Sequence, residues 1–303
     1  MDSPAETGDE RFRAPLITSG GRRAVLLTSD GVPIEAEHRP AQDDSGHLAI
    51  VVAHGFTGAL DRPAIRAVAR RMSGFGAVVT FSFRGHGRSG GRSTVGDREV
   101  LDLDAAVVWA RSLGYTRVAT LGFSMGGSVV LRHAGRTGPV APRARTDAVV
   151  AVSSPARWYY RGTAPMRRLH WVVTRPAGRL VSRVGLRTRV HSREWDPVPL
   201  SPVESVPHIA PTPLLVVHGD RDGYFPLDHP LSLFDAADPA TSDLWIERGF
   251  GHAENAADAA LLSRIGEWLR RSTSQAPSPV TADPVRTEPP AGTGHDGRRH
   301  DET

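Results

Sequence analysis

Short apolar runs alternate along the chain with longer segments in which apolar residues recur every three or four positions. The runs are mostly apolar, and residues 48–53 are continuously so, as expected for strands buried on both faces of a parallel sheet. They cover residues 48–53, 77–83, 118–121, 148–152 and 214–218. The spaced segments predict amphipathic helices over residues 63–72, 99–113 and 256–271. This alternation predicts an α/β fold with a mostly parallel central sheet flanked by helices.

Shorter runs complete the expected sheet. Residues 24–28 and 34–38 alternate in polarity and are joined by a turn-rich link, so they predict an antiparallel hairpin at a sheet edge. Residues 244–247 predict the last strand. Ligands of such sheets bind beyond the carboxyl ends of the strands, so we expect the functional site in the loops that follow them.

The same signals divide the chain into segments. Strand and helix patterns run almost without a break over residues 23–271, which predicts one domain after a flexible N-terminal segment of residues 1–22. Residues 153–208 are too long for a simple crossover and predict a short helical lid inserted after the sixth strand, with helical pieces at 165–174 and 177–184. Residues 272–303 have almost no apolar side chains and predict a disordered tail.

Composition narrows the class of protein. The chain has no apolar run of the roughly 20 residues that span a bilayer and no secretory signal, so a cytoplasmic protein is expected. The absence of cysteine excludes disulfides, thiolate metal sites and a cysteine nucleophile. The net charge of +4 comes from arginine alone, since the chain has no lysine. No nucleic-acid signature accompanies this charge, so no nucleic-acid partner is expected.

Residues 121–128 contain a G-x-S-x-G pattern formed by Gly122, Ser124 and Gly126. An apolar strand precedes it and an apolar helical run follows, which is the context of a nucleophile elbow. Small residues on either side let strand and helix pass closely, while the turn forces Ser124 into a sparsely populated backbone conformation. Ser124 is therefore the candidate nucleophile. A free serine hydroxyl attacks poorly at neutral pH, so the site needs a base.

Five motifs resemble those of α/β-hydrolases, most closely the lysophospholipase and monoacylglycerol-lipase-like esterases of the serine aminopeptidase S33 type. They are H-G-F-T-G from His54, F-R-G-H-G-R-S from Phe83, G-F-S-M-G-G from Gly122, H-G-D-R-D from His218 and G-F-G-H from Gly249. The resemblance implies the α/β-hydrolase fold and a catalytic triad in the order Ser, Asp, His. It also implies a serine hydrolase that cleaves a carboxylic ester through an acyl-serine intermediate, without a cofactor.

The resemblance assigns a role to each triad position. Ser124 is the nucleophile and His252, in a Gly-rich turn after the last strand, is the base. The acid is Asp222 or Asp220, two carboxylates that follow the same strand. The family's H-G-x-x-D pattern favours Asp222, which would orient the imidazole and stabilise the imidazolium, and leaves Asp220 a loop-structuring role.

The resemblance further implies an oxyanion hole made by the backbone N–H groups of Phe56 and Met125. Arg84 and His86 lie in a Gly-rich loop and are expected to be structural. That loop lacks the lysine of a phosphate-binding loop, so nucleotide binding is not expected. No metal-ligand spacing is present, and we expect no metal.

The predicted lid combines aromatic and apolar residues with many arginines, and no acid occurs between Asp147 and Glu194. The residues expected to contact substrate are Phe56, Trp158, Tyr159 and Trp171. In one interpretation the apolar face of the lid covers an acyl chain while its arginines meet an anionic head group or membrane surface. In the other, the lid is a packed helical cap with a solvated basic face.

The same machinery serves thioester, amide and C–C bond hydrolysis and perhydrolysis, so the bond cleaved stays open. The alternative from another class is a non-catalytic α/β-hydrolase-like protein that binds a small ligand or a partner. A missing triad member would mark such a protein, and none is missing here. The expected partner is a small ester or acyl substrate, and the oligomeric state stays open.

Overall fold

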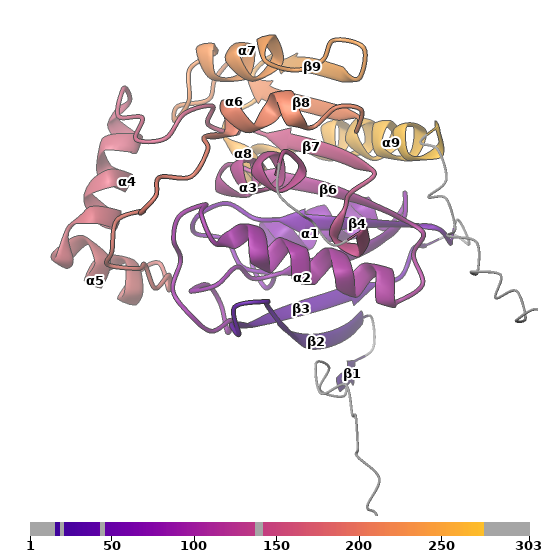
Figure 1. Ribbon diagram of the computed structural model, residues 1–303, viewed down its shortest axis with the longest axis horizontal. Helices are drawn as coiled ribbons and strands as arrows, with labels where there is room; N and C mark the ends of the chain where they lie inside the picture. The colour runs from indigo at the N-terminus through magenta and orange to yellow at the C-terminus, as the bar shows by residue number, and fades with distance from the viewer. Residues whose placement is uncertain (1–15, 19–20, 43–45, 137–141, 276–303) are drawn as a thin grey trace, which may run out of the picture.

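The structure is a computed structural model that describes residues 16–18, 21–42, 46–136 and 142–275. In this part of the chain nine strands form one sheet, in the order β1-β2-β3-β5-β4-β6-β7-β8-β9 (Figure 1). The strands are β1 (Leu16–Thr18), β2 (Gly21–Leu27), β3 (Pro33–Arg39), β4 (Leu48–Ala53), β5 (Ala77–Phe81), β6 (Arg117–Phe123), β7 (Ala148–Val152), β8 (Leu214–Gly219) and β9 (Ser242–Glu247). The pairs from β1 to β5 through β3 are antiparallel and the others are parallel, which confirms the expected mostly parallel sheet.

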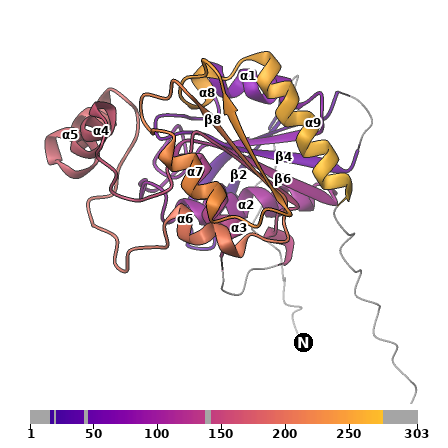
Figure 2. The ribbon, with the colours of Figure 1, turned by 90° about the horizontal axis from the view of Figure 1, so that it is seen from above.

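Helices cover both faces of the sheet, because successive strand residues point to opposite sides. In β4 the odd-numbered residues pack in a core with α2 (Glu99–Ser112) and α3 (Met125–Ala134), and the even-numbered ones pack with α1 (Pro63–Met72) and α9 (Ala259–Gln275). Figure 2 shows these two helix layers on either side of the strands. Each fully buried Val, Leu or Ile in the two cores contributes roughly 1.5–3 kcal/mol to folding.

The described residues between β7 and β8 hold helices α4 (Ala164–Thr174) and α5 (Pro176–Val184), which confirms the two expected helical pieces. Both views place α4 and α5 to one side of the body (Figures 1 and 2). The insertion follows the strand at residues 148–152, as expected. This strand is the seventh of the sheet, whereas we expected it to be the sixth. The additional strand is β1, whose three residues are too few to show a pattern.

Other boundaries also differ from expectation. Strands β1 and β2 begin inside residues 1–22, which we expected to be flexible. The C-terminal helix is divided into α8 (Ala253–Ala256) and α9, because the Asp258 side chain accepts the N–H of Leu261 and starts a new helix. Helix α9 continues to Gln275, four residues into the expected disordered tail, and the rest of that tail lies outside the described residues.

Two more helices were not expected, α6 (Pro202–Ser205) and α7 (Asp228–Asp235). Helix α6 lies near the end of residues 153–208, whereas α7 lies between β8 and β9 in the chain and packs against both strands. No helix in the ranges that the structure describes is long and apolar enough to cross a membrane.

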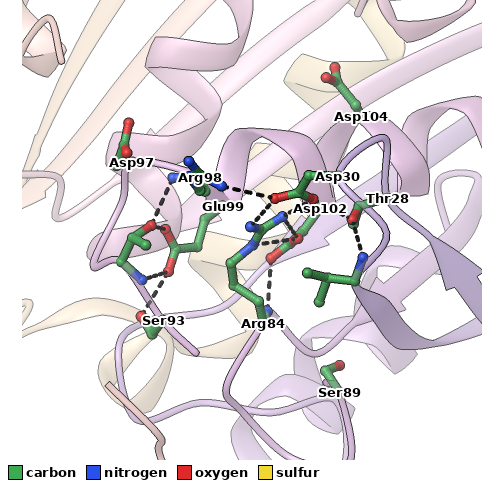
Figure 3. A network of polar contacts seen from close by, with 12 residues as sticks. Thr28, Asp30, Arg84, Ser89, Ser93, Asp97, Arg98, Glu99, Asp102 and Asp104 are labelled. Carbon is green, nitrogen blue, oxygen red and sulfur yellow. Dashed lines mark hydrogen bonds and ion pairs between the residues drawn. The ribbon is translucent and has the colours of Figure 1, made fainter. Parts of the chain in front are cut away.

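A buried ion-pair network joins the turn between β2 and β3 to the loop after β5 (Figure 3). The Arg84 side chain is 3% exposed and donates to Asp30 at 2.7 Å and to Asp102 of α2 at 2.8 Å. The backbone N–H of Arg84 also donates to Asp102, at 2.8 Å. Burial raises the pKa of the Asp102 carboxyl, while the contacts with Arg84 oppose that rise. Arg84 therefore holds the loop by charge, as the expected structural role requires.

Replacing Arg84 by methionine leaves the Asp102 carboxylate buried without its cation. We expect Arg84→Met to lower the free energy of unfolding by about 3–5 kcal/mol, measured by urea denaturation at pH 8. The loss shrinks as the pH is lowered toward 5, because Asp102 then takes up a proton in the folded variant before it does so in the unfolded chain. Arg66→Met, which breaks an exposed pair with Asp61, is the control and costs at most about 1 kcal/mol. A pH-independent loss for Arg84→Met would contradict this account.

Candidate active site

Ser124 occupies the sharp turn between β6 and α3. Its φ of 51° and ψ of −115° lie in the sparsely populated region that the sequence pattern predicts. The Ser124 N–H donates to the carbonyl of Val152 at 2.9 Å, which ties the turn to β7. A Cβ atom added at Gly126 would lie 2.2 Å from the carbonyl oxygen of Ala53, and one at Gly122 would lie 2.2 Å from that of Gly126. Only glycine fits at these two positions, so strand and helix can cross closely enough to form the turn.

A line of hydrogen bonds runs from Ser124 to a buried carboxylate. The Oγ of Ser124 lies 3.0 Å from Nε2 of His252, and Nδ1 of His252 lies 2.8 Å from Oδ2 of Asp222. An ionised carboxylate can only accept, so Nδ1 carries the proton and Nε2 is free to accept from Ser124. The three residues come from the ends of β6, β9 and β8, and the fold brings them together as the sequence motifs predicted.

The structure separates the two candidate acids. Asp222 contacts His252, whereas Asp220 accepts the backbone N–H of Gly249 at 2.6 Å and structures the neighbouring loop. Burial alone would raise the pKa of Asp222. The hydrogen bond to His252 and the N–H groups of Tyr224 and Phe225 outweigh burial and lower that pKa. Asp222 is therefore held as an anion beside the imidazole.

The rings of Tyr224 and Phe225 also hold His252 in place. Tyr224 stacks on the imidazole, with ring centroids 4.2 Å apart, and Phe225 lies 5.7 Å away. The sequence analysis missed both residues. Their position directly after the candidate acid is the signal that points to them, because that loop must pass close to the histidine.

The loop after β4 brings Phe56 beside the serine. A Cβ atom added at Gly55 would lie 3.5 Å from the Cβ of Ser124, so the loop is packed against the elbow. Met125 opens α3, and the first N–H groups of a helix have no acceptor inside the helix. Phe56 and Met125 both line the cavity at Ser124. That their N–H groups form an oxyanion hole stays a prediction from the sequence.

A cavity of about 370 Å³ opens at Ser124 and extends under the insertion. Phe56, Trp158 and Tyr159 line it as expected, but Trp171 does not. Met166, Leu169 and Val173 of α4 face the cavity instead. Trp171 lies on the opposite side of that helix, 47% exposed, in a separate shallow hollow. The prediction for Trp171 is wrong because it was made from residue type and ignored the phase of the helix.

The far wall of the cavity is held by Glu99, a buried residue at the start of α2. Its carboxylate accepts from the Ser93 hydroxyl at 2.7 Å (Figure 3). It also accepts from the N–H groups of Thr94 and Gly96, at 2.8 and 2.9 Å. The carbonyl of Thr94 in turn accepts from the indole of Trp195, which packs edge-on against Trp158. Trp195 lines the cavity and had no sequence signal, since it lies in an irregular segment.

The insertion returns to the body beside this wall. The N–H of Ser93 donates to the carbonyl of Arg189 at 2.7 Å, and the N–H of His191 donates to the carbonyl of Ser93 at 2.8 Å. One side of the cavity is thus fixed to the sheet through Glu99, and the other consists of α4. In the described ranges, no group of three His, Asp or Glu side chains is placed to hold a metal ion.

Residues 45–198 match the family model described as Hydrolase_4, serine aminopeptidase, S33. This span is just over half of the chain and contains the elbow and the Phe56 loop, while Asp222 and His252 follow it. No curated protein matches the chain.

Solved structures share the architecture at low sequence identity. The esterase Pf2001 of Pyrococcus furiosus is 22% identical, with coverage of 83% of this chain and 92% of its own and a TM-score of 0.63. Est1E of Butyrivibrio proteoclasticus, solved with ferulic acid, is 20% identical, with coverage of 82% and 98% and a TM-score of 0.55. XC6422 of Xanthomonas campestris, a serine hydrolase described as having no lid, is 18% identical, with coverage of 86% and 97% and a TM-score of 0.53. These likenesses show the α/β-hydrolase fold.

The elbow geometry predicts the effect of adding one methyl group. Gly126→Ala forces apart α3 and β4, so we expect a loss of about 1–3 kcal/mol in unfolding free energy and loss of the reactivity of Ser124 toward a fluorophosphonate. Gly74→Ala is the matched control, because its new Cβ would meet nothing closer than 3.5 Å. Urea denaturation and labelling at a fixed reagent concentration measure the two effects. Normal labelling of Gly126→Ala would show that the close approach is not required.

Proposed function

Because the chain belongs to the serine aminopeptidase S33 family of α/β-hydrolases, we propose that it is a serine hydrolase that cleaves a carboxylic ester through an acyl-Ser124 intermediate. The observation that carries this proposal is the unbroken line from Asp222 through His252 to the Oγ of Ser124. The line ends in a cavity whose surface is mainly apolar, although arginines such as Arg157 and Arg161 also line it. A nucleophile, a base and an orienting acid in hydrogen-bond contact are what acyl transfer requires.

In the proposed reaction, Nε2 of His252 takes the proton of Ser124 as Oγ attacks the ester carbonyl. The N–H groups of Phe56 and Met125 stabilise the oxyanion, each by about 3 kcal/mol. Asp222 stabilises the imidazolium, which then protonates the departing alcohol. Water attacks the acyl-enzyme with His252 again as base, and Ser124 recovers its proton when the acid leaves.

We propose that the acyl group lies between Phe56 and the aromatic wall of Trp158 and Trp195. The cavity volume of about 370 Å³ is at the small end of ligand sites, which suits a short to medium chain or a single aromatic ring. The structural relative Est1E binds ferulic acid, an aromatic acid of that size class. A panel of p-nitrophenyl esters, acyl-CoA thioesters and aminoacyl amides ranks the bond types, and we expect the esters to react fastest.

We also propose that residues 153–208 act as a lid that contacts anionic lipid. Leu180, Val181 and Val184 of α5 are 50–72% exposed and form an apolar ridge. Arginines flank this ridge, and among the described residues 161–193 no arginine forms an ion pair with an acid. An exposed apolar ridge with unpaired arginines fits the interface of an anionic lipid surface. A cytoplasmic location stays a prediction from the sequence.

Three substitutions test the proposed triad. Ser124→Ala abolishes labelling by a fluorophosphonate and turnover of p-nitrophenyl esters. His252→Ala lowers kcat by about 10⁴- to 10⁶-fold, and Asp222→Asn by about 10³- to 10⁴-fold, because each removes part of one proton-transfer unit. Asp220→Asn keeps an oxygen for the N–H of Gly249 and stays close to wild type. A wild-type protein that neither labels nor hydrolyses any member of the ester panel would refute the proposed activity.

Introducing negative charge on the apolar ridge of α5 tests the proposed contact with lipid. We expect the wild-type protein to sediment with phosphatidylglycerol vesicles at low salt and not with phosphatidylcholine vesicles. Leu180→Glu combined with Val184→Glu removes this binding and leaves hydrolysis of a soluble ester unchanged. Leu231→Glu, at an exposed leucine of α7, is the control and still binds. Failure of the wild type to bind anionic vesicles would remove the proposal.

A further inference from the structure

Glu254 is a buried carboxylate that the proposed reaction does not use. It lies two residues after His252 in α8 and is 8% exposed. Its Oε1 accepts the backbone N–H of Gly55 at 3.1 Å, across 199 positions of sequence. A carboxylate loses much of its hydration on burial, so a site that keeps one must use it or be destabilised by it.

The contact lies on the peptide that precedes the Phe56 donor. A Cβ atom at Gly55 would lie 3.2 Å from Oε1 of Glu254 on one side and 3.5 Å from the Cβ of Ser124 on the other. Gly55 is therefore enclosed between the carboxylate and the nucleophile.

Two histidines hold the next peptides of the same loop. The N–H of Phe83 donates to Nε2 of His54, so Nδ1 carries the proton and donates to the carbonyl of Gly55 at 2.6 Å. That carbonyl belongs to the peptide whose N–H is the Phe56 donor, and the bond polarises this N–H. His86 contacts the carbonyl of Phe56. Burial lowers the pKa of His54 to about 3, so this arrangement persists at neutral pH.

Burial raises the pKa of the Glu254 carboxyl, and the hydrogen bond that this carboxyl accepts from the N–H of Gly55 opposes that rise.

We propose that Glu254 is a positioning residue that holds the His54–Gly55 peptide beside Ser124 and so couples the loop of the proposed oxyanion donor to the turn that carries His252. This clamp joins the two loops that must keep a fixed separation during acyl transfer. This inference rests on the proposed hydrolase activity. Wild-type labelling of Ser124 and turnover of a p-nitrophenyl ester are therefore established first, and their failure would refute the activity rather than the clamp.

Two substitutions separate the acceptor from the charge. Glu254→Ala removes both, and we expect kcat to fall roughly 10- to 100-fold with KM changed less than about threefold, the effect of a displaced oxyanion donor. Glu254→Gln keeps an oxygen for the Gly55 N–H and restores kcat to within roughly threefold of wild type.

Controls distinguish positioning from loss of stability. Val107→Ala removes buried methyl groups on the opposite face of the sheet, and Glu267→Gln removes an exposed negative charge of α9. Rates are divided by the concentration of sites that a fluorophosphonate titrates, and we expect both controls to keep kcat per titrated site close to wild type. The clamp is overturned if Glu254→Ala keeps wild-type kcat per titrated site. It is also overturned if Glu254→Gln is as slow as Glu254→Ala.

Discussion

The crossing of β4, β6 and α3 within van der Waals contact is the constraint on which the rest of the site depends. Gly126 lies against the carbonyl of Ala53, so the nucleophile turn and the strand that leads to Phe56 are locked to one another. Because the strands are parallel, β8 and β9 end at the same edge and deliver Asp222 and His252 to the serine. A positive φ at Ser124 costs about 1–3 kcal/mol, which the packed cores on both faces of the sheet offset.

Buried carboxylates hold the loops at this edge of the sheet. Glu99 accepts N–H groups of the cavity wall. Asp222 accepts N–H groups of the residues that follow it in the sequence, and Glu254 accepts the N–H of Gly55. Asp102 does the same for Arg84 and also pairs with its side chain. Each carboxylate accepts backbone N–H groups that would otherwise be buried without a partner. The same interaction that orients the imidazole thus also shapes the cavity and the donor loop.

Much of the fold and of the candidate site could be predicted from the sequence, because both depend on short-range sequence patterns. Continuous apolar runs reveal β4, β7 and β8, whose residues are all buried, and glycine spacing reveals the elbow. Family motifs identified the three residues that the structure places in contact. The contacts of Glu254 and Trp195 could not be predicted from the sequence, since each residue binds a partner that lies far away in the chain. Trp171 was misassigned because its side of α4 is set by packing, which residue type does not report.

The two halves of the cavity differ in how they are supported. The half that holds Ser124, Phe56 and Met125 is fixed by strand crossings and buried carboxylates. The other half is α4, which packs mainly against α5 and has no ion pair to the body through its own arginines in the described residues. A substitution on the inner face of α4 is therefore expected to change the shape of the cavity without disturbing the hydrogen bonds among Ser124, His252 and Asp222. In the proposed hydrolase, specificity for the acyl group and the chemistry of bond cleavage are consequently separable.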